Sequence, residues 1–140
     1  MTKNSKNDAT KILVVVDFAP MRRVVKTLLR QSGYKTFVEA EGQSEGFEAL
    51  KANKNISLVV SDWKMEQGSG LGLLSLIRDD KALRSLPLLM VTSENDKQVT
   101  LEAMKPYSDS QYIVKPFTGK ALEEKIHTLL RAKAGEKKAS

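Results

Sequence analysis

The chain has 140 residues, of which 41% are hydrophobic and 29% are charged, a composition typical of one globular domain. It contains no cysteine and no apolar run of membrane-spanning length, which argues against disulfides, thiolate catalysis, cysteine-bound metals and membrane insertion. The net charge is +6, but no nucleic-acid recognition motif accompanies the basic residues, so we expect no nucleic-acid partner.

Strand and helix patterns alternate from the first apolar run onward. Residues 1–10 are polar and are expected to form a flexible N-terminus. The run "KILVVVD", residues 11–17, has continuous apolar side chains, as in a parallel strand that is covered on both faces. Pro20 suits the first turn of the helix that follows, and Gly33 is a stop signal for that helix.

Four further pairs of strand and helix follow. Strands are predicted at residues 35–40, 56–62, 86–93 and 110–115, and helices at residues 43–53, 70–80, 96–105 and 119–133. This alternation predicts an α/β fold, a doubly wound five-stranded parallel sheet with helices on both faces. We expect residues 11–132 to form the domain and residues 133–140 to form a basic flexible tail.

Polar side chains stand where the predicted strands end, and these ends meet at one edge of a parallel sheet, where ligands bind. They are Asp17, Asp62, Thr92 with Ser93, and Lys115. Carboxylate oxygens suit a hard divalent cation such as Mg²⁺, and a carboxylate can attack phosphorus to form an acyl phosphate. The set therefore indicates a site for a phosphoryl group, whose transfer depends mainly on positioning and charge neutralisation.

Two competing chemistries fit the sequence poorly. The loop "DFAPM" after the first strand contains no glycine, which argues against a P-loop or a Rossmann nucleotide site. The sole histidine, His127, falls in the last predicted helix, away from the strand ends, which argues against a histidine-based hydrolase.

Four segments occur in an order and spacing that point to a known family: "DFAPMRR", "VVSDWKM", "LLMVTSE" and "YIVKPFTGKALEEK". With them the chain resembles the receiver domains of bacterial two-component response regulators, and within that family the single-domain chemotaxis regulators. The resemblance covers about residues 11–130. It implies a flavodoxin-like fold with strand order 2-1-3-4-5, an order that the alternation by itself does not determine.

The resemblance also implies roles for individual residues. Asp62 is the implied phosphoacceptor, while Thr92 and Lys115 are implied to contact the phosphoryl group. Asp17, Asp62 and the backbone carbonyl of Lys64 are the implied ligands of Mg²⁺. The domain would then catalyse its own phosphorylation and dephosphorylation, and it would not be a conventional enzyme.

The same resemblance implies a signalling role. The sequence has no membrane-spanning run, and its start has no apolar signal-peptide core, so the cytoplasm is the expected location. The implied phosphodonor is a histidine kinase, and the implied target, for example the flagellar motor switch, binds the fourth helix, fifth strand and fifth helix. Tyr112 is the implied switch, which turns inward when Thr92 moves, and Lys97 and Lys125 belong to the same face. The simpler alternatives are a half-buried strand tyrosine and two surface lysines.

Three departures from the family pattern stand out. Val16 occupies a position where receivers usually carry an acid, so Mg²⁺ should bind more weakly. Glu66 occupies a position that is usually proline, and the loop before Tyr112 is one residue longer than usual. The loss of the acid leaves two hypotheses open: a working phosphorylation switch, or a pseudo-receiver that binds partners without useful phosphorylation.

Lys64 is the last feature singled out by the sequence. It lies two residues after Asp62, so we expect its ammonium to pair with Asp17, Asp62 or Glu94 and either to replace the cation or to compete with it. Together with Glu94 it could set the lifetime of the acyl phosphate by flanking the path of the attacking water. The alternative is a solvated loop lysine.

Overall fold

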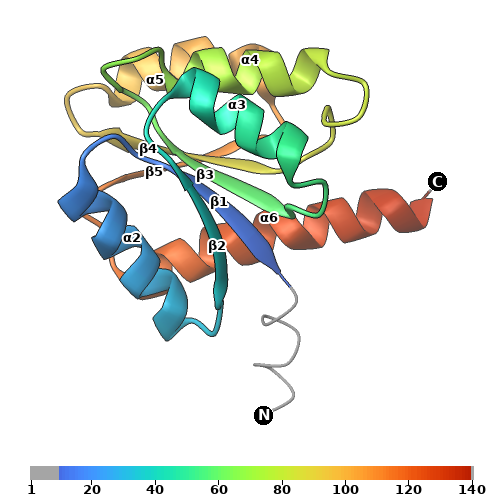
Figure 1. The fold of residues 1–140 in the computed structure, drawn as a ribbon, viewed down its shortest axis with the longest axis horizontal. Coiled ribbons are helices and arrows are strands. Elements are labelled where there is room, and N and C mark those ends of the chain that lie inside the picture. The colour runs from blue at the N-terminus through green and yellow to red at the C-terminus, as the bar shows by residue number, and fades with distance from the viewer. Residues whose placement is uncertain (1–9, 140) are drawn as a thin grey trace.

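The computed structural model describes the backbone of residues 10–139 and the side chains of residues 10–132. Five parallel strands form one sheet in the order β2-β1-β3-β4-β5 (Figure 1). They are β1 (Lys11–Val15), β2 (Thr36–Ala40), β3 (Leu58–Asp62), β4 (Leu88–Ser93) and β5 (Gln111–Lys115). Both the predicted α/β class and the strand order implied by the family resemblance are confirmed.

Helices cover both faces of the sheet. The helices are α2 (Ala19–Gln31), α3 (Gln43–Ala52), α4 (Gly70–Asp79), α5 (Lys97–Met104) and α6 (Gly119–Ala139), with a short 3₁₀ turn, η1 (Lys105–Tyr107), before β5. Figure 1 shows α2 and α6 on one face and α3, α4 and α5 on the other. This is the doubly wound arrangement that right-handed crossovers produce from alternating strands and helices.

The two predicted flexible ends fall largely outside the described residues. Residues 1–9 are not among them, nor are the side chains of residues 133–140. The backbone of α6 continues to Ala139, past the predicted domain boundary at residue 132. The flexibility of both ends therefore stays a prediction.

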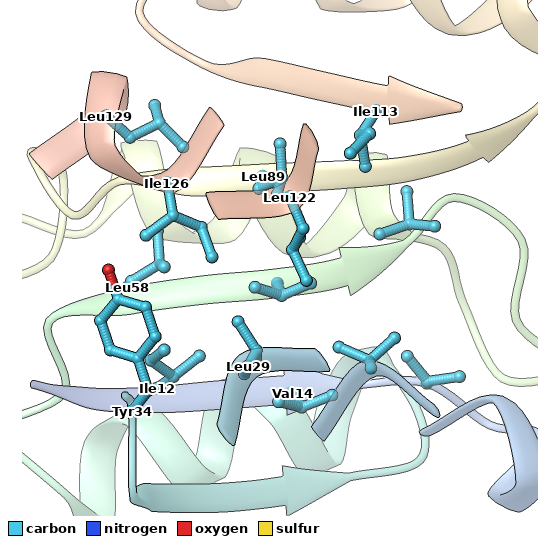
Figure 2. Close-up of a cluster of buried hydrophobic side chains, with 14 residues drawn as sticks. Ile12, Val14, Leu29, Tyr34, Leu58, Leu89, Ile113, Leu122, Ile126 and Leu129 are labelled. Atoms are coloured by element: carbon cyan, nitrogen blue, oxygen red, sulfur yellow. The ribbon is translucent and has the colours of Figure 1, made fainter. Parts of the chain in front are cut away.

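The core consists of two apolar layers, one on each side of the sheet. Ile12 and Val14 face α2 and α6, whereas Leu13 and Val15 face the other helices, as expected when successive side chains of a strand alternate. Figure 2 shows the first layer, in which side chains of β1, β3, β4 and β5 meet those of α6. Because both faces are buried, the sheet is a rigid platform for residues at its carboxyl edge.

Two glycines shape this scaffold. Gly33 follows α2 with φ of 99°, a left-handed conformation that favours glycine, and so ends the helix as predicted. Gly70 begins α4 directly against β3, and a Cβ at this position would overlap the carbonyl oxygen of Asp62 and the sulfur of Met90. Glycine weakens the start of α4, but here it allows the helix to approach the end of β3.

Candidate phosphoacceptor site

Asp62 is the last residue of β3, at the centre of the sheet, and it is only 7% exposed. Its Oδ1 accepts a hydrogen bond from the Trp63 N–H at 3.1 Å and lies 3.5 Å from Lys115 Nζ. Lys115 reaches this carboxylate from the end of β5, past the intervening strand β4. The structure thus brings together a buried carboxylate and an ammonium that lie far apart in the sequence.

Burial controls the ionisation of Asp62. Removal from water raises the pKa of this carboxyl above its ordinary value of 3.8, Lys115 and the Trp63 N–H oppose that rise, and the charge of Asp17 adds to it. The raised pKa shows that desolvation and Asp17 outweigh Lys115. Ionisation of Asp62 therefore lowers the free energy of unfolding, and such perturbed groups are common at functional sites.

This loss of stability leads to a prediction for Asp62→Asn. Because the pKa is raised in the folded state, the protonated carboxyl contributes stability that is complete below about pH 3.8 and is lost as the pH rises through the raised pKa. The neutral amide does not ionise, so at about pH 7 the variant should unfold at a higher temperature than the parent. The difference should shrink as the pH falls toward 4, which thermal unfolding followed by circular dichroism measures. Asp79→Asn, at an exposed site in α4, is the control, and a variant less stable than the parent near neutrality would contradict the prediction.

Asp17 lies at the same edge, two residues after the end of β1. Its Oδ2 accepts a hydrogen bond of 2.8 Å from the backbone N–H of Glu66, in the loop between β3 and α4. Proline has no N–H to donate, so this bond depends on the departure at residue 66. The sequence showed that departure but not its consequence, which is that the loop after Asp62 is tied to Asp17.

Thr92 follows on β4 and is 1% exposed. Its hydroxyl oxygen lies 2.8 Å from the hydroxyl oxygen of Thr100 in α5, so the two side chains are hydrogen-bonded. Sequence reasoning missed Thr100. The signal was available, because Thr100 and Met104 are four residues apart on the buried face of α5, and a buried hydroxyl needs a partner.

Comparison with known proteins agrees with this geometry. The family model described as "Response regulator receiver domain" matches residues 12–127. The chain belongs to this receiver-domain family. Chemotaxis protein CheY1 of Helicobacter pylori (strain ATCC 700392 / 26695) is 38% identical over 120 residues, which are 86% of this chain and 96% of the relative. The CheY homolog of Campylobacter jejuni (serotype O:23/36, strain 81-176) is 36% identical over 126 residues, or 90% and 96% of the two chains.

Solved structures show the same receiver fold. A response regulator receiver domain protein from Clostridium thermocellum superposes with a TM-score of 0.79 at 28% identity, covering 89% of this chain and 97% of the other. Chemotaxis protein CheY4 of Vibrio cholerae superposes with a TM-score of 0.76 at 21% identity, covering 86% and 98%. The second match supports the fold alone. Within the described part of this receiver, no helix is long and apolar enough to cross a membrane.

The oxygen donors proposed for Mg²⁺ lie at or just after the ends of β1 and β3, and only two of them are carboxylates. Asp17, Asp62 and the backbone carbonyl of Lys64 are hard donors of the kind that Mg²⁺ prefers. The described residues contain no group of three or more acidic, histidine or cysteine side chains placed to hold a metal. The donor set therefore fits the ion chemically, as a site with two carboxylates.

Val16, where many receivers have an acid, is part of the core. It is 1% exposed and packs in the apolar layer beneath α2 and α6. Its N–H donates to the carbonyl of Ala40 at 3.1 Å, and its carbonyl accepts from Arg22 Nη1 at 2.6 Å. The residue thus contributes packing to the fold and adds no charge to the candidate metal site.

Lys64 differs from the sequence-based expectation. Its ammonium lies 3.5 Å from Asp96 Oδ2, so the expected pairing with Asp17, Asp62 or Glu94 is wrong. Asp96 is the N-cap residue of α5, and its Oδ2 also accepts a hydrogen bond from the Ser93 hydroxyl at 3.2 Å. The Lys64 side chain is 78% exposed, so this pair contributes at most about 1 kcal/mol.

Tyr112 lies half-buried in β5, beside the helices expected to carry the signal. Its ring packs against the apolar layer under α3, α4 and α5, and Lys125 Nζ of α6 lies 5.1 Å from the ring centroid. The loop before β5, predicted to be one residue longer than usual, begins with η1. The structure therefore places the Lys125 ammonium of α6 beside the Tyr112 ring, while α5 covers the opposite face of the sheet from α6 (Figure 1).

Proposed function

We propose that this receiver domain is a phosphorylation switch in which Asp62 accepts a phosphoryl group from the phosphohistidine of a kinase. The observation that carries the proposal is the buried Asp62 carboxylate, with Lys115 Nζ 3.5 Å from its Oδ1. A carboxylate oxygen attacks phosphorus, the P–N bond breaks, and the imidazole takes up a proton as it leaves. The product is an acyl phosphate, and water later attacks it to return the carboxylate and inorganic phosphate.

The side chains around Asp62 have separate roles in this proposal. Lys115 balances the phosphoryl charge, and Thr92 donates its hydroxyl hydrogen to a phosphoryl oxygen. Asp17, Asp62 and the carbonyl of Lys64 would hold Mg²⁺, which supplies further positive charge when bound. The domain acts only on its own phosphoryl group, so it is a switch rather than a conventional enzyme.

The proposed output face comprises α5, β5 and α6. Val99 of α5 is 60% exposed, and Lys97 and Lys125 give the same face positive charge. Such a surface fits a partner segment that combines acidic and apolar side chains. The named relatives are chemotaxis proteins, so we propose a chemotaxis partner in the cytoplasm, such as the flagellar motor switch, with Tyr112 as the element that responds to Thr92.

The direct test is incubation with acetyl phosphate and Mg²⁺, followed by intact mass measurement. We expect the protein to gain the mass of one phosphoryl group. No gain with acetyl phosphate or phosphoramidate at saturating Mg²⁺ would instead support the second candidate, a pseudo-receiver. The buried, uncharged Val16 favours that candidate, because it leaves the metal site one carboxylate short.

We also propose that Lys64 and Glu94 lengthen the life of the acyl phosphate by narrowing the approach of water. Since Lys64 is exposed and held by Asp96, its effect should be small: Lys64→Ala should speed dephosphorylation about threefold. Decay of the phosphorylated protein after removal of the donor, at saturating Mg²⁺, measures this rate. Lys54→Ala, in the loop before β3 at the opposite edge of the sheet, is the control. An unchanged or slower decay for Lys64→Ala would leave Lys64 as a solvated loop lysine.

A further inference from the structure

Two threonines share a hydrogen bond inside the protein, next to the candidate site. Thr92 is 1% exposed and Thr100 is fully buried, and their hydroxyl oxygens are 2.8 Å apart. Thr100 Oγ1 also lies 2.8 Å from the backbone carbonyl oxygen of Asp96, the N-cap residue of α5. The chain of three groups therefore connects the end of β4 to the start of α5.

The direction of each bond follows from the number of hydrogens. A carbonyl oxygen can only accept, so the single hydroxyl hydrogen of Thr100 goes to Asp96. Thr92 must then be the donor in the bond between the two hydroxyls. The only hydroxyl hydrogen of Thr92 is thus committed to α5 in this state of the protein.

We propose that Thr100 is a positioning residue that holds the Thr92 hydroxyl in the unphosphorylated state and so opposes activation. The inference rests on the proposed function of Asp62. A phosphoryl oxygen can only accept, so Thr92 can bind it only by withdrawing its hydrogen from Thr100. The Thr100 oxygen then loses its donor at a site that water does not reach, which is unfavourable.

The same exchange carries the signal into α5. Asp96 receives the Thr100 hydroxyl through its carbonyl, while its carboxylate accepts from Ser93 and pairs with Lys64. A change at Thr100 therefore acts on Asp96, the N-cap residue of α5, and through Lys64 on the loop that follows Asp62. Since α5 belongs to the proposed output face, release of Thr100 couples the phosphoryl group to that face.

Titration with fluoroberyllate, an analogue of the phosphoryl group, in the presence of Mg²⁺ tests this inference. Trp63 is a natural reporter, because its N–H bonds to Asp62 Oδ1, and its fluorescence should change on binding. Thr100→Val removes the acceptor but keeps the side-chain shape, so fluoroberyllate should bind about fivefold more tightly, the equivalent of one net hydrogen bond of about 1 kcal/mol. Thr92→Val should weaken binding, and adding Thr100→Val to it should give no further change.

Two control variants separate this role from general packing. Thr100→Ser keeps the hydroxyl and should bind fluoroberyllate as tightly as the parent. Thr128→Val removes an equivalent hydroxyl-to-carbonyl bond within α6, to Glu124 at 3.0 Å, and should have no effect. If Thr100→Val does not fold, Thr100→Ala removes the same hydroxyl and should show the same gain.

The outcomes distinguish this inference from the proposed function. If the parent binds fluoroberyllate and Thr100→Val binds it no more tightly, Thr100 does not restrain Thr92 and the inference fails alone. A gain that persists in the Thr92→Val background would equally overturn it, because the effect would not pass through Thr92. If the parent does not bind fluoroberyllate at saturating Mg²⁺, the proposed function fails and the inference falls with it.

Discussion

Asp62→Asn should abolish the gain of one phosphoryl group that acetyl phosphate is expected to produce in the parent. The amide nitrogen and oxygen of asparagine are poor nucleophiles, and the substitution keeps the shape of the side chain. The loss of signal should therefore be complete, not partial. Intact mass spectrometry after incubation with acetyl phosphate and Mg²⁺ measures it directly.

The control is Asp79→Asn, which removes an exposed carboxylate of α4 and should leave the phosphoryl gain unchanged. Ser61, next to Asp62 in the sequence, is a competing acceptor, but its hydroxyl is buried and donates to the carbonyl of Asp62 at 3.1 Å. An acyl phosphate is hydrolysed by mild alkali, whereas a serine phosphate survives it for longer. An undiminished mass gain in Asp62→Asn would move the acceptor to another residue.

The layers of the fold and the edge that carries the site could be predicted from the sequence. Continuous apolar runs such as "KILVVV" require cover on both faces, and parallel strands bring their carboxyl ends to one edge. Asp62 and Lys115 follow such runs, so their meeting at 3.5 Å is a consequence of strand order. The order itself came from the resemblance, because alternation alone permits several orders.

The contacts that adjust the site could not be predicted in the same way. The pairing of Lys64 with Asp96 and the bond from the Glu66 N–H to Asp17 both join a loop to another element. Such contacts depend on the detailed conformation of the loops, which neither the residue pattern nor the hydrophobic periodicity reports. Thr100 differs, because its place on the buried stripe of α5 indicated burial, although not its partner.

Val16→Asp should tighten Mg²⁺ binding about tenfold, which corresponds to about 1.4 kcal/mol. The parent site has two carboxylates, and a third would add charge next to Asp17. Arg22 is the rival partner for the new carboxylate, because its Nη1 already lies 2.6 Å from the Val16 carbonyl. The Arg22 Nε is already paired with Glu39 at 2.9 Å, however. We therefore expect the new carboxylate to interact with the divalent ion and not with Arg22.

The same substitution should make the fold depend on Mg²⁺. Val16 is 1% exposed in the apolar layer, so its loss should destabilise the metal-free protein by about 2 kcal/mol, and repulsion among the three carboxylates adds to that. Mg²⁺ removes the repulsion, so the unfolding temperature of the variant should rise with Mg²⁺ far more than that of the parent.

Two measurements test both effects of Val16→Asp. Trp63 fluorescence reports the affinity for Mg²⁺, and circular dichroism reports the unfolding temperature. The control is Val16→Asn, because asparagine has the shape of aspartate without its charge. This variant should be less stable than the parent but should bind Mg²⁺ like the parent. If Val16→Asp and the parent give the same titration, the missing acid does not limit metal binding, and the case for a pseudo-receiver loses its main support.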